Sequence, residues 1–166
     1  MKEAIGSTWL IGIIITFIAI FSGFLAYSIS YTKAFRVKNE IINLIEKNEG
    51  FEKSKNNLNN ISDSDLKKDT STEARIFDYI KSLGYNYSNF ENGANPCNSQ
   101  NGELQIGGYC LIRYCPNNGE VTRTYYKVTT YISLSLPIIN INFNLPISGE
   151  TKALYYDMGN LECSKD

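Results

Sequence analysis

The stretch WLIGIIITFIAIFSGFLAYSISY, from Trp9 to Tyr31, decides the fold of this chain. It is the centre of residues 4–32, which contain no charged side chain. As an α-helix this segment would be about 43 Å long, whereas the hydrocarbon core of a bilayer is only about 30 Å thick. Trp9 lies near one end of the stretch and Tyr27 near the other, where amphipathic rings prefer the headgroup level. The sequence therefore predicts a transmembrane helix over residues 7–32.

The same helix is expected to continue beyond the apolar stretch. Apolar residues recur there with the i, i+3, i+4, i+7 spacing of an amphipathic helix: Ala34, Val37, Ile41, Leu44 and Ile45. Charged residues fill the other face: Lys33, Arg36, Lys38, Glu40, Glu46 and Lys47. No Pro or Gly interrupts this pattern before Gly50. One helix is predicted from about Ile5 to Asn48, with residues 33–50 as an amphipathic continuation that packs on a domain.

Composition excludes several classes of function. The remaining part of the chain, about 120 residues, suffices for one small domain with its own core. A net charge of −1 gives no electrostatic case for binding nucleic acid. Histidine is absent, so the usual Ser-His and Cys-His arrangements are missing, and no glycine-rich phosphate loop follows a strand. We expect no enzyme, no catalytic residue, no metal site and no cofactor.

The four cysteines are Cys97, Cys110, Cys115 and Cys163. An even number in a small membrane-anchored domain favours two disulfides and an oxidising compartment. Zinc is the alternative, but its signal is weak because there is no Cys-x-x-Cys and no histidine; free thiols are the third reading. Cys110 and Cys115 are an odd number of residues apart on one predicted strand, so their side chains should point to opposite faces. Cys110 and Cys115 are therefore not expected to pair with each other, which leaves Cys97 and Cys163 as their partners; of the two remaining pairings we favour Cys97–Cys110 and Cys115–Cys163.

Two rules disagree about the orientation of the domain. Lys33, Arg36 and Lys38 outnumber Lys2 and the amino terminus, so the positive-inside rule would place the domain in the cytoplasm. That rule is weaker for long translocated domains. The cysteines and the polar surface, rich in Asn and Tyr, argue for the outside. We predict a single-pass membrane protein with an extracytoplasmic C-terminal domain.

Residues 51–71 are rich in Lys, Asn, Ser and Asp and are predicted to form a polar surface linker. The acidic run that starts at Asp63 is a poor calcium loop, because Lys68 stands where glycine belongs and Ala74 where glutamate belongs. Next, Ser71 or Thr72 is expected to cap a short helix that Gly84 ends.

Residues 72–166 are expected to form a domain of one helix and an antiparallel sheet, which makes the fold class α+β. Residues 85–108 look like a loop. Strict alternation of apolar and polar residues predicts a sheet with one buried face. It puts three apolar residues of the third strand inside and their polar neighbours outside: Ile141, Phe143 and Leu145, against Asn140, Asn142 and Asn144. The predicted strands cover residues 109–115, 121–136, 139–147 and 151–157, with a turn at 116–119.

The layout resembles that of type IV pilins and pseudopilins. It has a short polar leader over residues 1–6, then a hydrophobic-to-amphipathic helix, then a compact cysteine-bearing sheet domain. Leaders of that family end in glycine, and Met1-Lys-Glu-Ala-Ile-Gly6 followed by Ser7 fits this pattern. The alternating strand up to Leu136-Pro137 and the sequence Ile-Ser-Gly-Glu at 147–150 are also similar to minor pseudopilins of the tight-adherence type.

The resemblance implies cleavage after Gly6 and a filament in which the N-terminal helices of neighbouring subunits bundle, with a place at the cell surface. The partners would be membrane lipid and other pilin-like subunits, and Gly12, Gly23 and Ala26 would allow close approach of the helices. One feature departs from the family. The fifth mature position, usually glutamate, is Ile11, which would suit a minor or initiating subunit.

Two other functions remain open at this stage. The chain would also suit a signal-anchored extracytoplasmic binding protein that never polymerises, or a small membrane subunit of a secretion or conjugation apparatus. The position of the mature N-terminus is the observation that separates them best.

Overall fold

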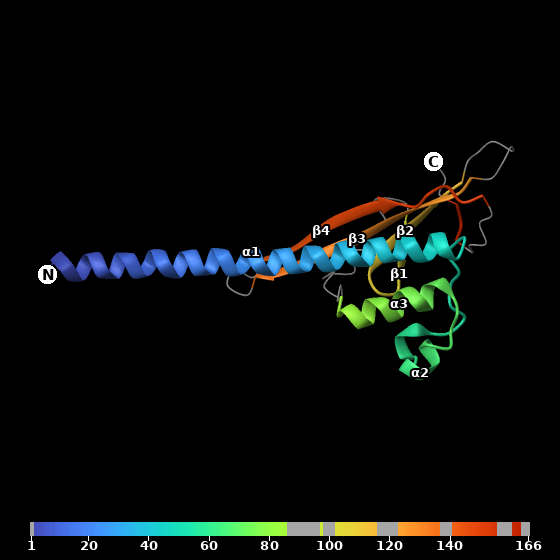
Figure 1. Cartoon of the computed structure of the whole chain (residues 1–166), viewed down its shortest axis with the longest axis horizontal. Helices are drawn as coiled ribbons and strands as arrows, with labels where there is room; N and C mark the ends of the chain where they lie inside the picture. Colours follow the sequence, from blue (N-terminus) through green and yellow to red (C-terminus); the bar gives the residue numbers. More distant parts are fainter. Residues whose placement is uncertain are drawn as a thin grey trace.

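The computed structural model describes residues 2–85, 97, 102–115, 123–136, 141–155 and 161–163; of residues 2–8, 59, 133–136 and 141–144 it describes the backbone only. The fold is α+β, as predicted. A long N-terminal helix lies along a four-stranded antiparallel sheet, and a smaller helical layer lies beside it (Figure 1).

Helix α1, Lys2–Lys47, is a single uninterrupted element. Its first half projects away from the rest of the molecule, and its second half lies on the sheet (Figure 1). The residues that the i, i+3, i+4 pattern places on one face are buried there: Ala34, Val37, Ile41 and Ile45. The predicted change from an apolar helix to an amphipathic one therefore coincides with the point where the helix meets the domain.

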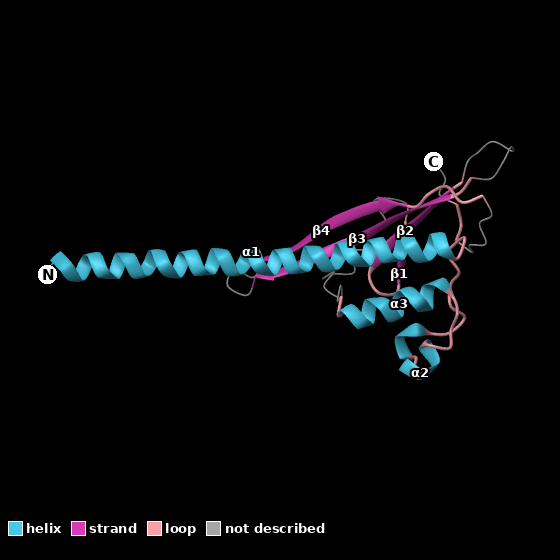
Figure 2. Cartoon of the chain, viewed as in Figure 1, coloured by secondary structure: helices cyan, strands magenta, loops and turns pink. Residues whose placement is uncertain are grey.

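The sheet has the strand order β1-β2-β3-β4, with every neighbouring pair antiparallel (Figure 2). Its strands are β1 Glu103–Gln105, β2 Tyr109–Tyr114, β3 Tyr125–Leu136 and β4 Ile141–Glu150. One face packs on α1: the hydroxyl of Thr130 donates to the carbonyl of Ala34 over 3.1 Å. Because side chains alternate along a strand, Tyr126 and Val128 share this face, and both are fully buried.

The opposite face of the sheet carries one of the two disulfides. Cys97 is bonded to Cys110, and Cys115 to Cys163, which is the favoured one of the two pairings that strand parity allows. The first bridge forms a small buried cluster with Tyr131, whose hydroxyl lies 3.0 Å from the sulfur of Cys110. The second bridge ties the C-terminal segment to the end of β2.

Helix α3, Thr72–Leu83, packs beside α1 and has the predicted caps. The Ser71 side chain accepts a hydrogen bond from the N–H of Ala74, and Gly84 ends the helix in the left-handed region at φ 59°. Its apolar face contributes Ile76 and Ile80 to the main core.

Residues 51–71, expected as a polar linker, are held on the domain by buried apolar side chains. Phe51 belongs to the main core, and Leu58 and Leu66 form a second cluster with Ala74. Two short elements lie in this segment: the 3₁₀ turn η1, Leu58–Asn60, and helix α2, Asp63–Leu66. Three apolar positions are thus enough to anchor an otherwise polar segment.

The predicted set of strands needs two corrections. Strand β1 lies inside the stretch expected to be a loop, and residues 151–155 form only a bridge between Leu154 and Thr124. The reason lies at Thr151. Its hydroxyl, in place of a backbone carbonyl, accepts the hydrogen bond from the N–H of Tyr126, so the chain leaves the sheet there. The predicted turn at 116–119 lies outside the described residues.

Only part of the face assignment predicted for β4 falls on side chains that the structure describes. Leu145, expected inside, is 43% exposed, so that expectation is wrong for this residue. It lies on the α1 side of the sheet, paired with the buried Ile132, but near the free edge. The side chains of residues 141–144, and residue 140 altogether, lie outside the described part.

Tyr85 closes an edge of β3 that no strand covers among the described residues. Strand β2 pairs with β3 only as far as Thr129. Just beyond, the Tyr85 hydroxyl accepts from the N–H of Tyr131 over 2.9 Å and donates to its carbonyl over 2.8 Å. At Tyr131, the Tyr85 hydroxyl thus makes the two hydrogen bonds that a neighbouring strand would otherwise make.

Tyr85→Phe removes both of these bonds while keeping the ring, so we expect it to lower the free energy of unfolding by about 1–3 kcal/mol. Urea unfolding followed by circular dichroism measures this. Tyr155→Phe, at a side chain that is 56% exposed, is the matched control and should change stability little. Equal effects of the two variants would show that the Tyr85 bonds contribute nothing.

Candidate functional site

The candidate functional surface is the apolar half of α1, residues 9–31. Its large apolar side chains are all exposed in the single chain, from 36% at Tyr27 to 74% at Trp9. Exposed apolar surface on this scale marks an interaction with lipid or with another protein.

By length and composition, α1 is able to cross a membrane, and none of its most apolar window is buried. A core helix of a water-soluble domain would be equally apolar, but it would be covered by the rest of the fold. The apolar half of α1 is left uncovered by the described part of the chain.

Four hydroxyl side chains in this half or next to it have hydrogen-bond acceptors within the helix. The hydroxyls of Thr16, Ser28 and Thr32 each donate to the carbonyl four residues earlier, over 2.8–2.9 Å, and Ser22 donates to the carbonyl of Ala19. A hydroxyl with an internal acceptor avoids most of the cost of leaving water. These residues therefore do not oppose an apolar environment. Hydroxyl residues in a helix commonly bond back to the preceding turn in this way.

An aromatic ladder marks the end of the apolar half. The rings of Tyr27, Tyr31 and Phe35 follow one another at centroid distances of 6.2 Å. The ammonium of Lys38 then lies 4.4 Å from the centroid of the Phe35 ring. Tyrosines followed by a lysine are typical of the level where a helix passes from hydrocarbon to headgroups.

The predicted packing residues lie open on this surface. A Cβ atom added to Gly12 or Gly23 would meet no atom within 4 Å, and Ala26 is exposed. At 100° per residue the three lie within about 60° of one another around the helix axis. Their arc continues the side of α1 that carries Ala34 and Val37, which faces the sheet. The structure thus brings the three onto one side of the helix.

The predicted processing residues, Gly6 and Ser7, lie in the first turns of α1. The structure describes their backbone only. Both precede the exposed apolar residues that begin at Trp9.

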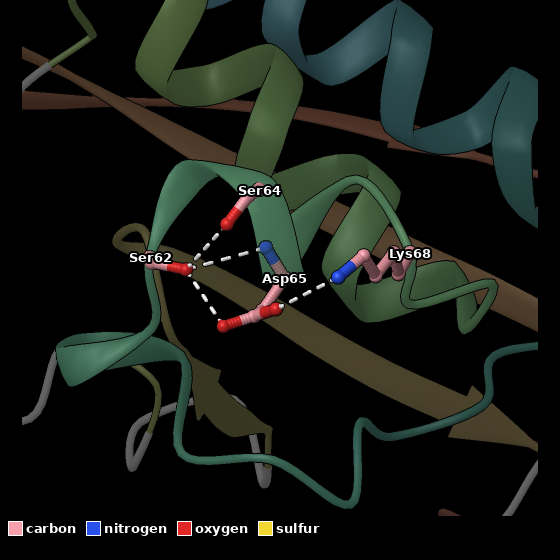
Figure 3. Close-up of polar contacts among 4 residues, drawn as sticks. All are labelled: Ser62, Ser64, Asp65 and Lys68. Carbon is pink, nitrogen blue, oxygen red and sulfur yellow. Dashed lines mark hydrogen bonds and ion pairs between the residues drawn. The ribbon is translucent and has the colours of Figure 1, made fainter.

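The acidic run that resembles a calcium loop has a structural use (Figure 3). Ser62 caps α2 by accepting from the N–H of Asp65, and its hydroxyl donates to the Asp65 carboxylate over 2.7 Å. Ser64 and Lys68 complete the group, with Lys68 3.4 Å from the same carboxylate. In the described ranges, no group of three or more Cys, Asp or Glu side chains is placed to hold a metal ion.

Two carboxyls near Ser54 have shifted pKa values in opposite directions. The hydroxyl of Ser54 and the N–H of Ser71 donate to Asp69 and hold its pKa at about 2, below the ordinary 3.8. Burial raises the pKa of Glu73 above 4.5, although the N–H of Ser54 donates to it.

By linkage, the Asp69 contribution to stability is present above pH 3.8 and is lost as the pH falls towards 2. The raised pKa of Glu73 has the opposite sign: its contribution is present below pH 4.5 and is lost as the pH rises through the folded-state value. Asp69 ties the two ends of residues 51–71 together, and Glu73 ties the segment to α3; the sequence pattern predicted neither contact.

The tyrosines of β3 serve packing. Tyr125 stacks on Tyr114 of β2 with ring centroids 4.9 Å apart, and Tyr126 is fully buried.

Comparison of the chain with protein-family models, with curated proteins and with solved structures found no match.

Proposed function

We propose that the chain is a membrane-anchored, pilin-like subunit that assembles through its N-terminal helix. The observation that carries the proposal is the division of α1. One continuous helix has an exposed apolar half, beginning at Trp9, and a half buried in the domain, from Ala34 to Ile45. A subunit that is stored in a membrane and then packed into a filament needs this arrangement, because lipid and neighbouring helices cover the same surface in turn.

Assembly would use the exposed surface directly. On leaving the bilayer, each helix would exchange lipid for the apolar stretches of its neighbours around residues 11–25. Without a hydrophobic driving force between helices in lipid, close packing at small residues favours association. Gly12 and Gly23, open in the single chain, suit that contact.

The domain is proposed to lie outside the cytoplasm. Both disulfides join segments distant in sequence, by 13 and 48 residues, and such bonds persist in oxidising compartments. This places Lys33, Arg36 and Lys38 on the outer side, against the positive-inside rule, which is weak for a translocated domain of this length.

Ile11 supports a second candidate, a signal-anchored binding protein that does not polymerise. A glutamate at this position is thought to register subunits in pilins, and isoleucine cannot do so. In the pilin-like reading, Ile11 instead indicates a minor or initiating subunit.

The intact mass of the protein from its native membrane separates the two candidates. A pilin-like subunit should be cut after Gly6 and begin at Ser7. Gly6→Val should then block maturation and leave Lys2 and Glu3 on the chain. Gly12→Val, the same substitution beyond the cut, should leave processing unchanged. Wild-type protein that retains Lys2 and Glu3, with no change in Gly6→Val, contradicts the proposal and favours the static anchor.

A further inference from the structure

The chain has two long uncharged stretches, and described parts of the second pack on α1 just beyond the first. The first is residues 4–32 of α1, and the second is residues 128–149, which span most of β3 and β4. Contacts with α1 fix how the strands lie. Thr130 bonds to the carbonyl of Ala34, and a Cβ atom on Gly149 would lie 2.9 Å from the side chain of Ile42.

These contacts set the level of the far end of the β3–β4 pair. Strand β4 runs along α1 in the same direction, since the N–H of Lys152 donates to Glu46 further on. From Gly149 back to Ile141 the strand covers about 26 Å, which equals about 17 residues of helix. The start of β4 therefore lies level with the stretch from Gly23 to Tyr27. Figure 1 shows this end of the two strands beside the middle of α1.

The outer boundary of the hydrocarbon core would lie close to this level of α1. The hydrocarbon core spans about 20 helical residues, so a core that begins next to Trp9 ends near Ile29. The end of the β3–β4 pair thus reaches the outer boundary of the proposed membrane.

Sequence and register give this end of the sheet one apolar face and one polar face. On the α1 side the paired residues are Ile132 and Leu145, Leu134 and Phe143, and Leu136 and Ile141. On the other side they are Ser133 and Asn144, and Ser135 and Asn142. On the α1 side, Ile132 is buried, whereas Leu145 is 43% exposed, so α1 leaves Leu145 partly uncovered.

We infer that the membrane-side end of the β3–β4 pair, residues 132–136 and 141–145, is a lipid-contacting element that lies in the headgroup layer beside α1. The inference rests on the membrane anchoring proposed above and not on polymerisation. Lipid is the occupant because Leu145 is exposed on the α1 side and this end of the pair lies level with the exposed apolar half of α1.

The unpaired edges of β3 and β4 limit how deeply this element can lie in the membrane. Strand β4 is an edge strand, and among the described elements β3 has no strand on its other side beyond Thr129. Backbone groups on such edges need polar partners, which hydrocarbon lacks and the headgroup layer supplies. The element therefore lies at the interface, and it would fix the tilt and rotation of the domain on the membrane.

The experiment uses tryptophan quenching by lipids brominated at known depths, on the full chain in phosphatidylcholine vesicles. Trp9 is the only tryptophan of the chain. In a Trp9→Phe background, Phe143→Trp and Leu145→Trp report on the element, and Tyr155→Trp reports on the far end of the sheet. We expect at least about twofold quenching of the Phe143→Trp variant by shallow bromines, less for Leu145→Trp, and almost none for Tyr155→Trp, following their levels along α1.

Each other outcome overturns a defined claim. Quenching of both reporters no stronger than that of Tyr155→Trp, while wild-type Trp9 is quenched, overturns this inference and leaves the anchor intact. No quenching of wild-type Trp9 overturns the anchor as well. Reporters that become shielded only at high protein density, and lose that shielding on dilution with lipid, show a second copy as the occupant and overturn the assignment to lipid. Because Leu145 is already exposed, its variant keeps the test valid if Phe143→Trp disturbs folding.

Discussion

Ile41→Ala should lower the free energy of unfolding of the domain by about 3–4 kcal/mol, within the usual range for a buried isoleucine cut to alanine. Ile41 is 1% exposed and lies in the core cluster with Val37, Tyr126 and Val128. The loss arises because α1 supplies one wall of that core, and the rigid sheet opposite closes a cavity only partly.

The matched control is Ile13→Ala, the same substitution in the same helix. Ile13 is 51% exposed and contacts no part of the domain core. Its effect on unfolding of the domain should be below about 0.5 kcal/mol. Guanidinium unfolding in detergent, followed by the tyrosine near-ultraviolet signal, measures both. Equal effects would mean that the second half of α1 is not part of the core.

The second large effect is expected on removal of the bridge between Cys115 and Cys163, by changing both to alanine. These residues are 48 apart in sequence, and closing a loop of that length in the unfolded chain corresponds to about 4 kcal/mol in the chain-entropy model. The described part of the C-terminal segment is also held by a hydrogen bond from Arg113 to the carbonyl of Leu161 and by burial of the Leu161 side chain in the main core.

The bridge between Cys97 and Cys110 provides the comparison. Its sequence separation is 13, which corresponds to about 3 kcal/mol. Both cysteines are fully buried, so replacing them also leaves a cavity. Thermal and denaturant unfolding of the two double variants measures these costs. A loss of less than about 1 kcal/mol on removing the Cys115–Cys163 bridge would contradict this account.

The parts of the fold that depend on periodicity were predictable. The change from an uncharged run to i, i+3, i+4 spacing located both halves of α1. A helix that is apolar all round and a helix with one core-facing stripe have different sequence patterns. The caps at Ser71 and Gly84 followed from local backbone chemistry. The two-residue period of a strand excluded a bridge between Cys110 and Cys115, and the structure selects one of the two pairings that this left open.

The parts that depend on tertiary contact were not predictable. Strand β1 has only three residues and exists because β2 offers it an edge. The alternation in β4 predicted correctly that Leu145 lies on the α1 side of the sheet. Whether the side chain is buried there depends on how far α1 extends across the sheet. The bonds that hold residues 51–71 join Ser54 to Asp69 and Glu73 across 15 and 19 residues, and no local pattern signals them.

Amide hydrogen exchange on the full chain in lipid vesicles tests the central claim most directly, namely that one helix serves both as membrane rod and as core element. The account predicts slow exchange without interruption from Trp9 to Lys47, with residues 9–31 losing their protection when the lipid is removed and residues 34–45 keeping theirs. A fast-exchanging break at residues 30–36 would contradict it, because the two halves would then be separate helices joined by a hinge.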